Sequence, residues 1–146
     1  MRLALLISVA LLATACSGYP ATGARDRFSP HSDGPPSASL ETRAGKSRLG
    51  LSSYCWKFPG RARVCQPAIP PKCGRPAQWV ENVAVERGET VRADLGYAPD
   101  VASVEGAQAK LDSRTVTWRV EHGGAFRLFT KGQKGEASYV GCAVLR

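Results

Sequence analysis

The sequence contains few of the residues from which catalytic and metal sites are usually built. Its 146 residues include 2 histidines, His31 and His122, and 5 cysteines. From Cys55 onward, nine, seven and 68 residues separate successive cysteines, whereas structural zinc sites favour ligand pairs two to four residues apart. No G-x-S-x-G motif is present, and nucleophilic catalysis needs a base and an orienting group beside the nucleophile. The sequence therefore predicts no metal, no cofactor and no catalytic residue.

Long apolar runs and helical stripes are also missing. The apolar run at residues 3–13 is shorter than the about 20 residues that a membrane-spanning helix requires. From residue 49 onward, no stretch carries an apolar stripe at helical spacing with capping residues at its ends. These absences exclude the run as a membrane span and favour strands for the rest of the chain.

The N-terminal segment has the pattern of an export signal. Arg2 precedes the apolar run at residues 3–13, and two small residues precede Cys16. A positive charge, a short apolar stretch and small residues before a break are typical of a secretory signal. The small pair before the cysteine resembles the lipobox of bacterial lipoproteins, with Ala13 standing where that pattern most often has leucine. The resemblance implies a lipoprotein signal peptide at residues 1–15.

The same resemblance implies that Cys16 becomes the mature N-terminus and carries a diacylglycerol on its sulfur and usually an acyl chain such as palmitate on its nitrogen. The protein would then be anchored in the cell membrane or the outer membrane and face the extracytoplasmic side. The alternative is plain secretion with cleavage near Ala15, which would leave Cys16 as an odd thiol. Without Cys16, four cysteines remain, an even number suited to two disulfides in an oxidising compartment.

Composition divides the remainder into a tether and one domain. Residues 16–48 contain four prolines, several glycines and serines, and few, scattered apolar residues. Such a segment cannot bury enough apolar surface to offset the entropy lost on ordering. We therefore predict a disordered tether at 16–48, in which His31 is solvated, and a single domain at 49–146.

The predicted domain is dominated by two-residue periodicity. Val91, Ala93 and Leu95 alternate with polar residues, and similar alternation recurs around Trp118 and through residues 138–145. Alternation of this kind predicts half-buried strands, and glycine-containing turns separate the runs. The pattern predicts an antiparallel β-sandwich of about seven strands.

Four cysteines allow three disulfide connectivities. We predict Cys55–Cys65, which closes a hairpin around the Pro-Gly turn at 59–60, together with Cys73–Cys142. The second bond would tie a proline-rich surface crossing, which has little else to hold it, to the last strand.

The tryptophans divide into core candidates and one candidate contact. Trp118 lies between two valines at core spacing, and Trp56, next to Cys55, is expected to cover a disulfide. Trp79, beside the proline-rich crossing, is the candidate surface contact because large exposed aromatics often mark interfaces.

The remaining titratable residues have simpler interpretations than catalysis. His122 lies in a glycine-flanked turn, where tolerance of unusual backbone angles explains it. A pair of carboxylates for glycoside hydrolysis could be drawn from Glu81, Glu86, Glu89, Asp94, Glu105 or Glu121. Most of these residues are predicted to stand at outward positions beside a basic residue, which is typical of a solvated face.

Four short motifs stand out in the domain: the Cys55-Trp56 pair, the return to Cys65, V-x-R-G-E-x-V at residues 85–91 and G-E-A-S-Y-V at residues 135–140. Together they resemble a group of small bacterial lipoproteins and secreted proteins that carry one immunoglobulin-like β-sandwich domain and have no assigned activity. The resemblance covers the whole predicted domain. It implies a fold and a location and supplies no catalytic residues.

The net charge of the chain limits the classes of partner that it is expected to bind. The formal net charge is +8, and residues 49–146 carry fourteen basic and nine acidic side chains with the signs interspersed. Nucleic-acid-binding chains usually show a denser basic cluster on one face, so no nucleic-acid partner is expected.

Two function hypotheses follow. The first is a non-catalytic envelope lipoprotein whose sandwich binds or spaces a ligand, with an anionic envelope polymer or an acidic protein as the favoured partner. The second is a small secreted hydrolase or hydrolase inhibitor. The basic charge counts against an inhibitor of a basic lysozyme, for which acidic surface would be expected.

Overall fold

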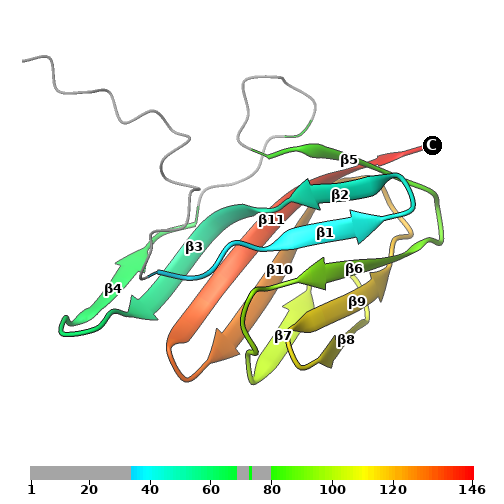
Figure 1. The fold of residues 1–146 in the computed structure, drawn as a ribbon. Coiled ribbons are helices and arrows are strands. Elements are labelled where there is room, and N and C mark those ends of the chain that lie inside the picture. The colour runs from blue at the N-terminus through cyan, green and yellow to red at the C-terminus, as the bar shows by residue number, and fades with distance from the viewer. Residues whose placement is uncertain (1–33, 69–72, 74–79) are drawn as a thin grey trace, which may run out of the picture.

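The computed structural model describes residues 34–68, 73 and 80–146, and within these ranges every regular element is a β-strand. The strands form two sheets that pack face to face (Figure 1). The predicted all-β sandwich is confirmed, with eleven strands in place of about seven.

The five-strand sheet forms the front layer in Figure 1. Its members are β1 (Ser39–Thr42), β2 (Gly45–Arg48), β6 (Thr90–Asp94), β8 (Ala109–Asp112) and β9 (Thr115–Arg119). They lie in the order β2-β1-β6-β9-β8, and every neighbouring pair is antiparallel.

The six-strand sheet lies behind the first. It contains β3 (Gly50–Lys57), β4 (Arg63–Gln66), β5 (Asn82–Val85), β7 (Val101–Val104), β10 (Gly124–Gly132) and β11 (Gly135–Leu145). The main order is β4-β3-β11-β10-β7 with antiparallel pairing, and β5 joins β11 as a parallel neighbour.

The core lies between the two sheets because each strand turns alternate side chains inward. In β6, for example, Val91 and Ala93 are fully buried while Arg92 between them is exposed. Burying one such aliphatic side chain is worth about 1.5–3 kcal/mol. The largest contributors include Leu40, Leu51, Trp56, Trp118, Leu128 and Tyr139. The predicted core position of Trp118 is confirmed.

A second, smaller apolar cluster covers part of the outer face of the six-strand sheet. It consists of Val80, Val140 and Cys142, and Val140 and Cys142 are at most 1% exposed. β11 is therefore buried on both faces over much of its length, which explains its nearly continuous apolar sequence.

Both predicted disulfides are confirmed. Cys55 and Cys65 stand directly opposite each other on β3 and β4, with 4.0 Å between their Cα atoms. Cys73 is joined to Cys142 on β11, with 5.6 Å between the Cα atoms. All four thiols are consumed in these bonds.

The predicted start of the domain at residue 49 is wrong. Residues 39–48, assigned to the tether, form β1 and β2, and Leu40 is only 1% exposed in the core. The short segment is held by pairing with β6, a contact that local composition does not reveal. Residues 16–33 of the predicted tether and the signal peptide at 1–15 lie outside the described residues.

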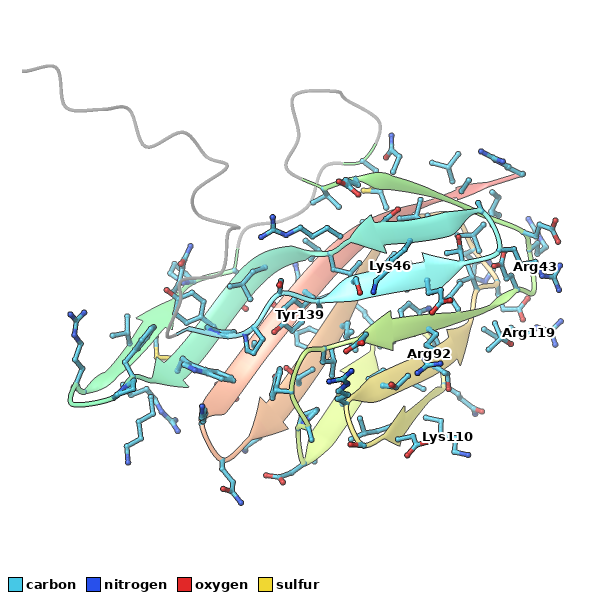
Figure 2. All side chains as sticks on the ribbon, in the orientation of Figure 1. Arg43, Lys46, Arg92, Lys110, Arg119 and Tyr139 are labelled. Carbon is cyan, nitrogen blue, oxygen red and sulfur yellow. A yellow bond between two sulfur atoms is a disulfide. The ribbon has the colours of Figure 1, made fainter. Side chains whose placement is uncertain are left out.

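A buried tyrosine fixes the chain just before β1. The Tyr139 hydroxyl donates to the carbonyl oxygen of Pro36 at 2.8 Å. Burial raises the pKa of Tyr139, so its hydroxyl stays protonated and available as a donor. The bond joins the central strand of one sheet to the entrance of the other (Figure 2).

The expectation that Trp56 covers a disulfide is also wrong. Neighbouring residues of a strand point to opposite faces, so Trp56 and Cys55 diverge. Trp56 is 2% exposed and packs edge-on against Tyr97 in the core, with ring centroids 5.4 Å apart. Cys55 and its disulfide lie on the outer face of the six-strand sheet.

Candidate functional site

The residues singled out in the sequence do not converge on one site. Cys16 and Trp79 lie outside the described residues. The cysteines 55, 65, 73 and 142 form two disulfides. His122 is exposed at one end of the sandwich.

His122 borders a hollow of about 450 Å³ that Trp118 and Phe126 also line. Two carboxylates, Glu105 and Glu121, lie in the same lining. Glu121 forms an ion pair with Arg119, with 2.8 Å between Oε1 and Nε. Within the described part of the chain, no hydrogen bond joins His122 to a carboxylate or a hydroxyl. The hollow thus holds an acid–base residue without the orienting partner that catalysis requires.

Glu89 differs from the other carboxylates because it is buried, at 5% exposure. It accepts hydrogen bonds from the backbone N–H of Arg43 at 2.6 Å and of Glu86 at 3.0 Å. These two bonds hold the pKa of Glu89 below its usual range. Glu89 therefore fastens the β1–β2 turn to the β5–β6 turn and has a structural role. Glu89 is thus an exception to the outward, solvated position that is expected of most of these carboxylates.

No metal centre emerges from the described ranges, where no three His, Cys, Asp or Glu side chains gather closely enough to hold an ion. The described residues also contain no helix that could cross a membrane.

A second hollow, of about 510 Å³, lies on the outer face of the six-strand sheet. The small side chains of Ser53 and Ser138 form its floor. The two residues lie side by side on neighbouring strands, with 2.7 Å between their hydroxyl oxygens. Phe129 and Val101 form one wall, at 41% and 59% exposure, and Pro67 belongs to the lining. Lys131 and Glu136 add charged groups to the same lining, so the hollow combines apolar walls with polar and charged side chains.

The outer face of the five-strand sheet has the opposite character. Lys46, Arg92 and Lys110, which we call the basic row, lie in one line across β2, β6 and β8 (Figure 2). The register fixes this line, because Lys46 pairs with Glu41, Glu41 with Arg92, Arg92 with Thr117 and Thr117 with Lys110. All three cations are exposed.

Two cations near the basic row form ion pairs, whereas within the described ranges the members of the row do not. Arg43 binds Glu86 at 2.7 Å, and Arg114 binds Asp94 at 3.6 Å. Among the described residues, no member of the basic row forms an ion pair, and Arg92 makes a single long hydrogen bond of 3.5 Å to Thr115. The row therefore presents charge to solvent along the sheet.

Sequence reasoning missed the basic row for a clear reason. Its members come from three distant segments, and Lys46 falls in the predicted tether. Outward placement of Arg92 could be inferred from the alternation of β6, but alignment with Lys46 and Lys110 depends on strand order and register.

Fold and surface together define a disulfide-linked β-sandwich with a solvated basic face. Comparison of the chain with protein-family models, with curated proteins and with solved structures gave no match.

Proposed function

We propose that the protein is a non-catalytic binding module, anchored to the extracytoplasmic face of a bacterial membrane by a lipid on Cys16. The observation that carries the binding role is the unpaired basic row. Folding does not require three cations in line on an exposed sheet that form no ion pair within the described residues, but such an arrangement attracts and orients anionic partners. The partner class is an anionic envelope polymer or an acidic protein.

The anchor is supported by the sequence around Cys16 and by the disulfides. Paired cysteines are typical of oxidising compartments outside the cytoplasm. We also propose that the protein is related to small bacterial lipoproteins with immunoglobulin-like domains. The four short motifs within residues 55–140 support this relationship. Repeated crossing of the chain between two packed sheets is compatible with that relationship.

We propose that the protein catalyses no reaction because its cysteines and His122 are not arranged for catalysis. All the described cysteines are in disulfides, so no described thiol is a nucleophile. His122 has no orienting partner within the described residues.

The hollow beside His122 supports a second candidate, a small secreted hydrolase. It combines an aromatic lining with an imidazole and two carboxylates. A hydrolytic activity lost in His122→Ala would favour this candidate over the binding module.

The test uses the mature protein purified from a bacterial membrane in detergent. Mass spectrometry of its N-terminus should find acylated Cys16, and a free N-terminus at another residue would contradict the anchor. The protein should be retained on an immobilised anionic polymer and not on a neutral one, and salt should weaken retention because it screens exposed charges. Retention that is indifferent to ionic strength would contradict the binding role.

A matched pair of variants locates the surface. Lys46→Gln/Arg92→Gln/Lys110→Gln should abolish retention. Lys57→Gln/Arg61→Gln/Arg63→Gln removes the same charge from exposed positions around the β3–β4 turn and should retain most of the binding. The same pair with Trp79→Ala added shows whether that tryptophan contributes.

A further inference from the structure

We infer that the basic row binds a linear acidic polysaccharide in which a carboxylate recurs once per disaccharide, with the glycan lying across the strands. The inference rests on the proposed binding function and specifies its ligand. Spacing, charge density, the residues between the cations and the lack of apolar anchors each support it.

Spacing is set by the sheet. Neighbouring strands lie about 4.8 Å apart, and the basic row occupies every second strand. Its cations therefore originate about 10 Å apart along the row, and the row spans about 19 Å. An extended acidic disaccharide has a repeat close to two strand spacings, so its successive carboxylates can meet successive cations. The length of lysine and arginine side chains absorbs the twist of the sheet.

Charge density disfavours nucleic acid. Duplex DNA carries one phosphate per about 1.7 Å of helix axis, far denser than the basic row. Three cations at wide spacing neutralise a small share of such a polymer. They match a polymer whose charges are sparse and regular.

Glu41 makes the row selective for that regular spacing. It lies between Lys46 and Arg92 in the register and is exposed. A polymer charged on every sugar would place a carboxylate beside Glu41, and like charges that close repel. A neutral sugar at the same place can donate a hydroxyl to Glu41.

Threonine occupies the corresponding place in the other half of the row. Thr117 lies between Arg92 and Lys110 and is partly exposed. Its hydroxyl can both donate and accept, which suits the hydroxyl groups of a sugar. The line across the sheet is thus cation, polar, cation, polar, cation.

Apolar anchors for a protein partner are on the other sheet. The exposed large hydrophobic side chains of the described residues are Val64, Val101, Phe129 and Val144, on β4, β7, β10 and β11 respectively. Protein–protein interfaces depend on apolar and aromatic anchors in their centre. The hydrophilic face of the five-strand sheet favours a hydrated polymer over an acidic protein.

The decisive experiment measures binding of defined oligosaccharides to the mature protein by calorimetry at low salt. The probes are glucuronate–N-acetylglucosamine oligomers with two or three carboxylates. The three-carboxylate oligomer should bind about tenfold more tightly, the gain expected from one more charge-assisted hydrogen bond. Lys110→Gln should remove most of this difference, whereas Arg61→Gln should leave it unchanged. Equal affinities for the two oligomers would overturn the inference.

A second measurement tests the spacing directly with polygalacturonate, which is charged on every sugar. Wild-type protein should prefer the alternating polymer, and Glu41→Gln should reduce that preference by improving the binding of polygalacturonate. Circular dichroism checks that each exposed substitution leaves the fold intact.

The remaining outcomes separate this inference from the proposed function. Tighter binding of duplex DNA or of an acidic protein through the basic row would overturn the glycan and leave the anionic binding module standing. Failure of every anionic probe to bind would overturn both.

Discussion

The two sheets of this sandwich use their outer faces differently. In β6 of the five-strand sheet, burial alternates with every residue. In β11 of the six-strand sheet, residues 137–143 are all buried, because the Val80–Val140–Cys142 cluster covers its outer side. Both disulfides also belong to the six-strand sheet.

The difference shows how a small domain can separate stability from binding. In the six-strand sheet, the central strand β11 is buried on both sides and the sheet is cross-linked, so part of its outer face contributes to the fold. The other needs its inner face alone for the core, which leaves its outer residues free to vary. The basic row lies on the sheet whose outer face is not needed for stability. Three sets of substitutions test this comparison.

The largest loss is expected from removing the disulfide that includes Cys142 of the outer cluster. Cys73→Ala/Cys142→Ala removes a disulfide between residues 69 positions apart. The conformational entropy that the unfolded chain regains should lower the free energy of unfolding by about 4 kcal/mol. Cys55→Ala/Cys65→Ala, with a separation of 10, should cost about 3 kcal/mol. Urea unfolding of both variants measures the difference. A larger loss from the short bridge would contradict the importance of the covered face.

A smaller loss is expected where the two sheets are tied together. Tyr139→Phe removes the donor to Pro36 and leaves its carbonyl oxygen without this partner. The free energy of unfolding should fall by about 1–2 kcal/mol. Tyr54→Phe is the control, because within the described residues its hydroxyl has no hydrogen bond. Thermal unfolding should separate the two variants. Equal stability would show that the bond to Pro36 contributes nothing.

The smallest loss is expected at the turn of the five-strand sheet. Glu89→Gln replaces a carboxylate that accepts two backbone hydrogen bonds and should cost about 1 kcal/mol at pH 7. The folded pKa of Glu89 is lowered from 4.5, so its contribution is complete above pH 4.5 and is lost as pH falls through the folded pKa.

The test of Glu89 is therefore a pH series of unfolding measurements. The difference between wild type and Glu89→Gln should shrink on acidification below pH 4.5. Glu121→Gln, which removes an exposed ion-pair partner, should change stability little at any pH. A pH-independent effect of Glu89→Gln would contradict the role of the ionised carboxylate.

The strands of the sandwich could be predicted wherever alternation was long and local. β6, β9 and the last strand were found from two-residue periodicity, and both disulfides followed from the hairpin and the unsupported crossing. β2 could not be found because its sequence, GKSR, contains no apolar residue. β8 was missed because Ala109 and Leu111 are half-buried in an otherwise exposed strand.

The candidate site was less predictable than the fold. The basic row arises from pairing between strands that are far apart in the sequence, and no local pattern specifies such register. The burial of Glu89 depends on two turns meeting. The error at Trp56 came from treating a sequence neighbour as a spatial neighbour, which the pleat of a strand forbids.

The position of β11 sets the order in which the sandwich can assemble. β11 follows all other described strands in the chain, yet it lies between β3 and β10 and also pairs with β5. During synthesis from the N-terminus, β3 and β4 can form only an isolated hairpin, which is marginally stable in water. The six-strand sheet therefore has no centre until the ribosome has made the final strand, and the contacts that complete it are long-range and slow to form. A nascent chain built in this order stays open until β11 has been made.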